Sequence, residues 1–128
     1  MPMSQKTPTS PRLPTTTWRD WILLLLRQRK KIRVTGDSMQ PTLHHGDIVL
    51  VDEKAYIKQT PAIGDIVIAK HPYQKNLKII KRIADITPEN RMLLHSDNPT
   101  MGTDSRQFGT ISPNRILGQV TSYSPIIK

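Results

Sequence analysis

The sequence predicts a mainly β domain preceded by a short helix, on the basis of three observations. Two runs of β-branched residues, at 48–51 and 66–69, each follow a Gly-Asp turn. The apolar pattern has helical spacing near residues 18–26 and a strand-like character from residue 32 onward. The length of 128 residues suits one compact domain and a tail. We therefore expect a disordered leader at 1–17, a basic amphipathic helix at 18–31 and a mostly antiparallel β-domain at 32–128.

Local composition justifies each expected element in chain order. Residues 1–17 hold four prolines among serines and threonines, and such a run buries too little apolar surface to offset its ordering entropy. In the predicted helix, Thr17 can act as the N-cap and Asp20 favours the positive helix end. Further strands are expected at 77–83, 91–94 and 118–123, with loops at 57–63 and 98–107. The two turn–strand units are too few for a solenoid and are interpreted as similar local structures in one sheet.

The basic charge is concentrated at the N-terminus. The chain has 19 Lys+Arg against 10 Asp+Glu, a formal net charge of +9. Residues 1–33 carry eight basic side chains and one acid, a balance of +7, and the other residues carry 11 and nine, a balance of +2. A nucleic-acid binder should carry cations on its fold together with stacking aromatics, which make up only 5% here. The distribution therefore argues against a nucleic-acid partner.

The predicted helix has the character of a surface anchor. Its uninterrupted apolar run, residues 21–26, is far shorter than the roughly 20 residues that a spanning helix needs. No transmembrane helix is expected, and no signal peptide either, because the basic residues follow the apolar run. The segment 18–31 is interpreted either as a peripheral contact with an anionic membrane or as a helix docked on the domain's own surface. The apolar stripe comprises Trp18, Trp21, Ile22, Leu25 and Leu26.

The chain also lacks the residues that several kinds of site require. It has no cysteine, which excludes disulfides, thiolate metal sites and a cysteine nucleophile. The four histidines match no standard spacing of metal ligands and are interpreted mainly as surface residues: His44, His45, His71 and His95. We expect no metal and no cofactor.

The sharpest local motif is residues 34–43, Val-Thr-Gly-Asp-Ser-Met-Gln-Pro-Thr-Leu. It is not a G-x-S-x-G elbow, because Gln40 replaces the second glycine, and it is not S-x-x-K, because Pro41 replaces the lysine. What remains is Ser38 in a tight Gly-Asp turn, which can present a hydroxyl outward and leave backbone N–H groups for an oxyanion. A turn of this type is common, so the motif alone indicates little.

Three boxes in order resemble the type I signal peptidases, a family of Ser–Lys proteases. Residues 36–42 look like the nucleophile box, residues 77–83 like the lysine box, and residues 97–98 through 104–106, followed by Phe108-Gly109, like the C-terminal box. The resemblance implies a small signal peptidase/LexA-like fold, a coiled antiparallel β-sheet. It also implies that Ser38 is the nucleophile and that Lys81, the lysine before the arginine, is its base.

The chemistry of a lysine base requires burial. A serine hydroxyl is a poor nucleophile until a base removes its proton, and a lysine can do so only as a neutral amine. Burial disfavours the ammonium, and on an alternating strand Lys81 would share a face with Ile79 and Ile83. Arg82 would then point the other way, as would the competing base Lys78.

The sequence departs from the family pattern at two positions. Gly102 stands where a serine often contacts the lysine, and Gly36 stands where some members carry an oxyanion-hole serine. The oxyanion hole would then rely on backbone N–H groups of Ser38 and Gly36, and Thr103 or Ser96 would orient the lysine. Asp37 and Met39 are expected to support the turn. Structural support of the site is expected from Asp97, Asn98, Asp104, Ser105 and Arg106.

Within the family, the short chain, residues 69–73 and the run 97–109 resemble the nickel-type superoxide dismutase maturation proteases. This implies removal of an N-terminal leader from a cytosolic precursor, by a cytoplasmic enzyme that itself binds no metal. Two alternatives stay open: a general signal peptidase I-like enzyme acting on exported precursors at the membrane, and a non-catalytic basic binding module. A self-cleaving repressor-type protein is a related possibility, but no helix-turn-helix pattern precedes the domain.

Overall fold

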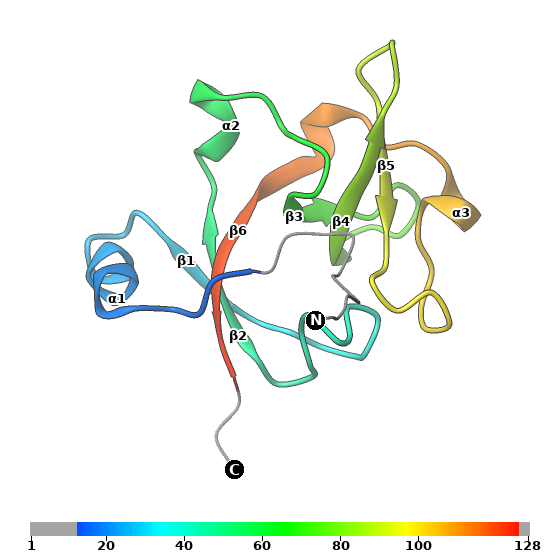
Figure 1. Ribbon diagram of the computed structural model, residues 1–128. Coiled ribbons are helices and arrows are strands. Elements are labelled where there is room, and N and C mark those ends of the chain that lie inside the picture. The colour runs from blue at the N-terminus through cyan, green and yellow to red at the C-terminus, as the bar shows by residue number, and fades with distance from the viewer. Residues whose placement is uncertain (1–12, 126–128) are drawn as a thin grey trace, which may run out of the picture.

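A computed structural model describes residues 13–125, and within them six strands form one antiparallel sheet (Figure 1). The strand order is β1-β2-β6-β3-β4-β5. The strands are β1 (Lys30–Arg33), β2 (Ile48–Asp52), β3 (Ile66–Lys70), β4 (Lys78–Ile86), β5 (Met92–His95) and β6 (Ile116–Ser124). The helices are short: α1 (Trp18–Leu25), α2 (Ala55–Lys58), α3 (Ser105–Phe108) and the 3-10 turn η1 (Pro113–Arg115). This is a mainly β architecture with an antiparallel sheet, as expected from the sequence.

The core lies on both faces of the sheet and is divided at β3. Ile66 and Ile68 contribute to one cluster of buried side chains, whereas Val67 and Ala69 contribute to a second. Successive side chains of a strand point to opposite faces, so β3 is covered on both sides and its sequence is a continuous apolar run. The second cluster includes Ile83 of β4, so the apolar surroundings of the lysine box lie on this face of the sheet.

The two Gly-Asp turns do fold alike. Gly46 and Gly64 have φ of 94° and 99°, which a side chain would strain. Each aspartate then closes its turn onto the residue three positions earlier: Asp47 accepts from the His44 N–H at 2.8 Å, and Asp65 from the Ala62 N–H at 3.1 Å. The same local chemistry starts β2 and β3, as the sequence pattern predicts.

The N-terminal helix is shorter than expected. It begins at the predicted cap, where Thr17 and Asp20 form a capping box, but it ends at Leu25 instead of continuing to residue 31. Arg27 has a φ of 63°, which breaks the helical path, and Lys30 begins β1, which pairs with β2. The basic end of the expected helix is therefore an edge strand, because tertiary pairing outweighs local helix propensity.

The segment before the helix is fixed to the sheet. The Thr16 N–H donates to the Tyr123 carbonyl at 2.7 Å, and the Tyr123 N–H donates to the Pro14 carbonyl at 3.0 Å. The Thr16 and Ser122 hydroxyls also bond at 3.0 Å. The expected disordered leader is thus wrong for residues 13–17, whose backbone pairs with the end of β6. Its first 12 residues lie outside the described part of the chain.

The remaining differences are in element lengths. β4 and β6 extend further than the predicted strands, and β5 begins one residue later. Each expected loop overlaps a helical turn: α2 shares residues 57–58 with the first loop, and α3 shares residues 105–107 with the second. In α3, Asp104 and Gln107 form a capping box. This sequence signal for a helix start was not taken into account when residues 98–107 were predicted to form a loop.

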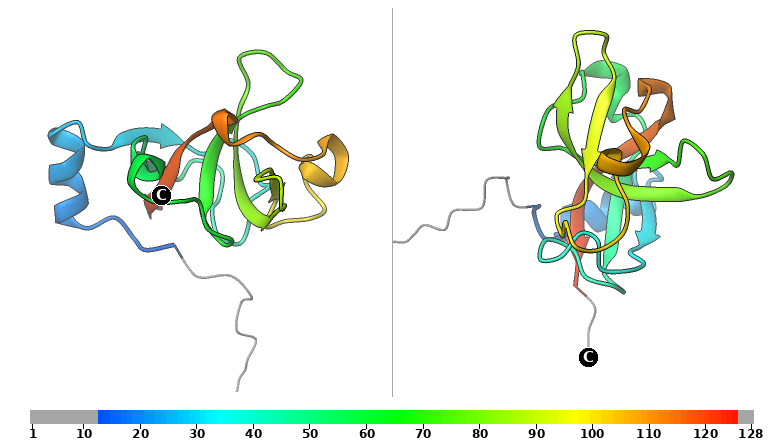
Figure 2. Two further views of the ribbon diagram at one scale, coloured as in Figure 1. Left: turned by 90° about the horizontal axis from the view of Figure 1, so that it is seen from above. Right: turned by 90° about the vertical axis from the view of Figure 1, so that its right-hand side faces the viewer.

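Helix α1 stands apart from the sheet (Figures 1 and 2), and none of its residues is buried. Trp18 is 76% exposed and Leu25 is 81% exposed. The alternative in which the stripe docks on the domain's own surface is therefore wrong. Across residues 13–125, no helix has the length and apolar character to cross a bilayer.

Candidate active site

Ser38 lies in the loop between β1 and β2, which is fixed by the buried Met39 and by hydrogen bonds to Asp37 and Ser38. Met39 is only 2% exposed and packs in the first core cluster. The Asn98 N–H donates to the Ser38 carbonyl at 2.8 Å, and the Asn98 side chain donates to the Asp37 carbonyl at 3.2 Å. The Gln40 side chain donates to the Asp37 carboxylate at 3.0 Å. Residues of the first and third sequence boxes thus hold the serine turn together.

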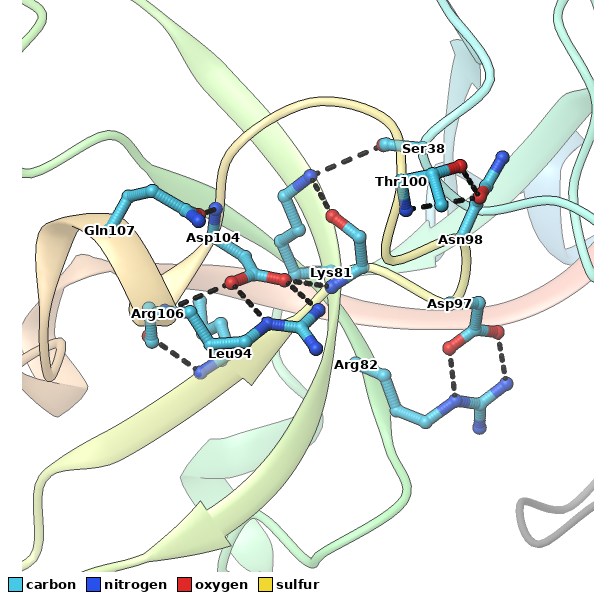
Figure 3. A network of polar contacts seen from close by, with 12 residues as sticks. Ser38, Lys81, Arg82, Leu94, Asp97, Asn98, Thr100, Asp104, Arg106 and Gln107 are labelled. Carbon is cyan, nitrogen blue, oxygen red and sulfur yellow. Dashed lines mark hydrogen bonds and ion pairs between the residues drawn. The ribbon is translucent and has the colours of Figure 1, made fainter.

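Lys81 projects from β4 toward this serine (Figure 3). Its Nζ lies 3.2 Å from Ser38 Oγ, and the residue is 4% exposed. Ile83 belongs to the second core cluster and Ile79 packs against it, on the face that Lys81 shares by strand alternation. The competing base, Lys78, is exposed. The geometry brings Ser38 together with Lys81 and not with Lys78.

Ser96 orients the lysine amine. Lys81 Nζ donates to Ser96 Oγ at 2.9 Å, and Ser96 is buried. Ser96 directly follows His95, the β5 partner of Arg82, so the sheet register places its hydroxyl beside Lys81. Thr103, the other candidate, is exposed.

Gly102, which has no side chain, lies next to Ser38 and Lys81. A Cβ at this position would be 3.2 Å from Ser38 Cβ and 3.9 Å from Lys81 Nζ. Its φ of 73° is also in the region that favours glycine. Residue 102 therefore does adjoin the lysine, as the family pattern implies, but the hydroxyl comes from Ser96 instead.

Burial lowers the pKa of the Lys81 amine from its usual value. The Asp104 carboxylate acts in the opposite direction and raises this pKa, while the Arg106 guanidinium lowers it. Desolvation is the largest of the three effects. Burial therefore shifts the protonation equilibrium of Lys81 toward the neutral amine.

Asp104 connects the lysine site to α3. Its carboxylate accepts from the Ser96 N–H at 2.8 Å and from Arg106 Nη2 at 2.6 Å. Burial raises the pKa of Asp104, but the bonds from Arg106 and from the Ser96 N–H outweigh burial and hold it well below its usual range. Next to it, Ser105 Oγ accepts from the Leu94 N–H at 2.8 Å. These contacts fix the end of β5 and with it the Ser96 hydroxyl.

Arg82 and Asp97 form a second brace; Asp97 was expected to support the site, but its pairing with Arg82 was not predicted. Arg82 points away from Lys81 (Figure 3) and binds Asp97 through Nε and Nη2, both at 2.9 Å. Asp97 also accepts from the Thr42 hydroxyl at 2.5 Å. The Arg82 guanidinium further donates to the Gly64 carbonyl at 2.7 Å. This bidentate pair ties β4 to the exit of the serine loop.

The oxyanion donors differ from the expectation at one position. The Gly36 N–H donates to His45 Nδ1 at 2.9 Å, so it is engaged within the loop. For the Ser38 N–H, no hydrogen-bond acceptor is found among residues 13–125. Of the two expected backbone donors, Ser38 is the one without an internal partner. No sequence spacing indicated the contact between His45 and Gly36.

The histidines are not all surface residues. His71 is buried against Phe108, and its Nδ1 accepts the N–H groups of Tyr73 and Gln74, both at 3.0 Å. In the described residues no three His, Cys, Asp or Glu side chains form a group that could hold a metal ion.

Comparison with known proteins places this geometry in a family. Residues 20–121 match the family described as Peptidase S24-like. Mitochondrial inner membrane protease subunit 1 of Xenopus tropicalis is 27% identical over 105 residues, which cover 67% of this chain and 63% of the relative. The Homo sapiens subunit is 29% identical over 108 residues, 70% of this chain and 65% of the relative. Signal peptidase I of Pseudomonas aeruginosa is 27% identical over 124 residues, 80% of this chain and 42% of the relative.

The matched segments span less than two thirds of these relatives' own lengths. The family match, in contrast, runs from α1 to β6 and includes the serine loop, β4 and the end of β5. The chain belongs to the Peptidase S24-like family.

Proposed function

We propose that this protein is a serine endopeptidase in which Ser38 is the nucleophile and Lys81 the general base, and that it removes an N-terminal leader from a precursor protein. The observation that carries the proposal is the 3.2 Å contact between Ser38 Oγ and a buried Lys81 Nζ whose pKa is lowered. A serine in a merely structural turn needs no desolvated amine beside it. This contact also weighs against the non-catalytic binding module.

The proposed reaction begins with neutral Lys81. Its lone pair accepts the Ser38 proton while Ser38 Oγ bonds to the scissile carbonyl carbon, and the Ser38 N–H stabilises the resulting oxyanion. The ammonium then returns the proton to the leaving amine as the C–N bond breaks, which leaves an acyl-enzyme. Water, deprotonated by the same amine, attacks the ester and releases the acid with regeneration of Ser38. Throughout, the Ser96 hydroxyl accepts an N–H of Lys81 and keeps the lone pair directed at Ser38.

For the substrate, we propose the precursor of nickel-type superoxide dismutase. This assignment rests on the resemblance of residues 69–73 and 97–109 to the corresponding maturation proteases. The cytoplasmic location is part of the same proposal, since it follows from that substrate. The alternative substrate is an exported precursor cut at the membrane, and it is favoured by the relatives named signal peptidase I.

Incubation of the purified chain with each precursor, followed by mass spectrometry of the products, tests the proposal. We expect a single N-terminal cut in the superoxide dismutase precursor and its loss in Ser38→Ala and Lys81→Met. Lys78→Met serves as the matched lysine control and should retain cleavage. Cleavage of only the secretory precursor would replace the substrate assignment, and cleavage that survives both dyad variants would reject the mechanism.

We also propose that α1 contacts an anionic membrane surface. Its exposed stripe of Trp and Leu can enter the headgroup region, and the exposed Arg27, Lys31 and Arg33 follow it. Flotation with vesicles that contain phosphatidylglycerol, an anionic lipid, should recover the chain with the lipid. A Trp18→Ser/Leu25→Ser variant should stay in the soluble fraction, and equal flotation of both proteins would reject the contact.

A further inference from the structure

Three basic side chains lie side by side where β6, β3 and β4 meet at one end of the sheet. Lys70 of β3 is directly opposite Lys78 of β4. Arg115 immediately precedes Ile116, the β6 partner of Ala69, so it falls beside Lys70. All three line one pocket of about 320 Å³ under the β3–β4 hairpin, together with Lys75 of the hairpin loop. Figure 2 shows this hairpin projecting from the sheet.

The charges of this pocket are uncompensated. Its lining includes four cations and neither aspartate nor glutamate. No ion pair of the described residues involves any of the four, whereas Arg29, Lys30, Arg82 and Arg106 each have a carboxylate partner. The remaining polar lining is His71, Gln74 and Asn76, of which the two amides can donate hydrogen bonds.

The arrangement is costly in the isolated chain. Like charges directly opposite each other on neighbouring strands are destabilising. Among the paired residues of the described strands, Lys70 and Lys78 are the only two with like formal charges at neutral pH. The dyad uses neither residue, since Lys78 lies on the face of β4 opposite Lys81. A bound anion would relieve the repulsion.

We propose that this pocket, which we call the hairpin cation site (Lys70, Lys75, Lys78 and Arg115), binds a phosphate group. A concave site with three ammonium groups and one guanidinium suits a compact anion with several oxygens, because Arg bonds phosphate through two N–H groups and Lys acts as a point charge. The group is free phosphate or the headgroup of a phospholipid. The site is independent of the proposed protease chemistry.

The first measurement is a titration of the full chain with inorganic phosphate at constant ionic strength, followed by amide chemical shifts. We expect saturable shifts confined to residues 70–78 and 115. Lys70→Gln/Lys78→Gln should weaken binding about tenfold or more, because charge-assisted hydrogen bonds are lost. The matched control is Lys54→Gln/Lys58→Gln, two exposed lysines outside the pocket, which should bind normally. Unsaturable shifts, or equal weakening by the control, would overturn the proposal.

A stability measurement tests the repulsion separately. Lys78→Glu replaces the like-charged pair by an opposite one, so its melting temperature without phosphate should exceed that of the wild type. Phosphate should raise the melting temperature of the wild type but not of this variant. A Lys78→Glu variant that melts lower than the wild type, or that still responds to phosphate, would contradict the site.

Vesicles distinguish the two sources of the phosphate group. The Trp18→Ser/Leu25→Ser background removes the proposed contact of α1, and vesicles with and without phosphatidic acid are then compared. Sedimentation that requires both phosphatidic acid and Lys70/Lys78 assigns a lipid headgroup. Absence of sedimentation, with phosphate binding intact, assigns the soluble anion. Both vesicle results support the site, which is rejected by failure of the phosphate titration or by the contrary outcome of the Lys78→Glu measurement.

Discussion

The hydroxyl of Ser96 should affect the rate of cleavage in a pH-dependent way. It accepts a hydrogen bond from Lys81 Nζ at 2.9 Å in a buried site. A hydrogen bond to a charged group contributes about 1.5–3 kcal/mol, and one between neutral groups about 0.5–1.5 kcal/mol. Ser96→Ala therefore costs the ammonium about 1 kcal/mol more than it costs the amine. The pKa of Lys81, already lowered by burial, should therefore fall further in the variant.

The same difference governs the transition state, in which the amine gains the Ser38 proton. Above the pKa of Lys81, the ground state loses a neutral hydrogen bond and the transition state a charged one, so kcat/KM should fall about fivefold. Below this pKa, both states carry the ammonium and lose the same bond. The profiles of the wild type and the Ser96→Ala variant should therefore converge at acid pH and separate at alkaline pH.

The assay is kcat/KM for leader removal across pH, with the Lys81 titration followed by NMR of labelled lysine. Ser122→Ala is the matched control, because Ser122 is also a buried serine with a hydroxyl bond, in this case to Thr16. It should change neither the shape of the profile nor the pKa. A ratio of wild type to Ser96→Ala that stays constant with pH would refute the orienting role and leave Ser96 a packing residue.

Three further outcomes are expected. Lys81→Met should lower the rate of cleavage by roughly 10²–10⁴-fold. Because the pKa of Lys81 is lower in the folded than in the unfolded chain, the folded chain binds fewer protons, and the free energy of unfolding of the wild type should rise with pH up to about 10.4. Urea denaturation across pH should show a weaker rise for the Lys81→Met variant. Gly102→Ala should lower the free energy of unfolding by about 1–3 kcal/mol and reduce kcat, because residue 102 has a φ of 73° and an added Cβ would lie 3.2 Å from Ser38 Cβ. An unchanged kcat would mean that the loop adjusts to the added methyl group without displacing Ser38. Arg82→Ala should destabilise the fold by about 3–5 kcal/mol in thermal unfolding because Asp97 keeps its charge without a cationic partner. Arg82→Ala/Asp97→Ala should recover part of this loss, and no recovery would indicate a role for Arg82 beyond the pair.

The sequence predicts most strands, and the face of β4 on which Lys81 lies, because their signals are local, whereas the pairing of Ser38 with Lys81 was inferred from the family resemblance of three boxes. The Gly-Asp turns fix where β2 and β3 begin, and alternation along β4 distinguishes Lys81 from Lys78. The extent of α1 could not be predicted, because the pairing of Lys30 and Lys31 with β2 is a long-range contact that competes with helix propensity.

Contacts between distant segments escaped prediction for the same reason. Ser96 was one of two candidates for orienting the lysine, and only the register of β4 and β5 distinguishes it from Thr103. The pair of Arg82 and Asp97 joins residues of two separate boxes, and His45 reaches Gly36 across a loop. None of these partners has a fixed spacing along the chain, so no local pattern could have indicated them.

Helix α1 is fixed at both ends, by the bonds of Thr16 to β6 and by β1 in the sheet edge. Its orientation relative to the sheet is therefore fixed. If its apolar stripe rests on a membrane, the tilt of the whole sheet relative to the lipid is set, and Ser38 is held at one height above the surface. Cleavage would then depend on how far a precursor's scissile bond stands from the bilayer, so distance as well as sequence would select the substrate.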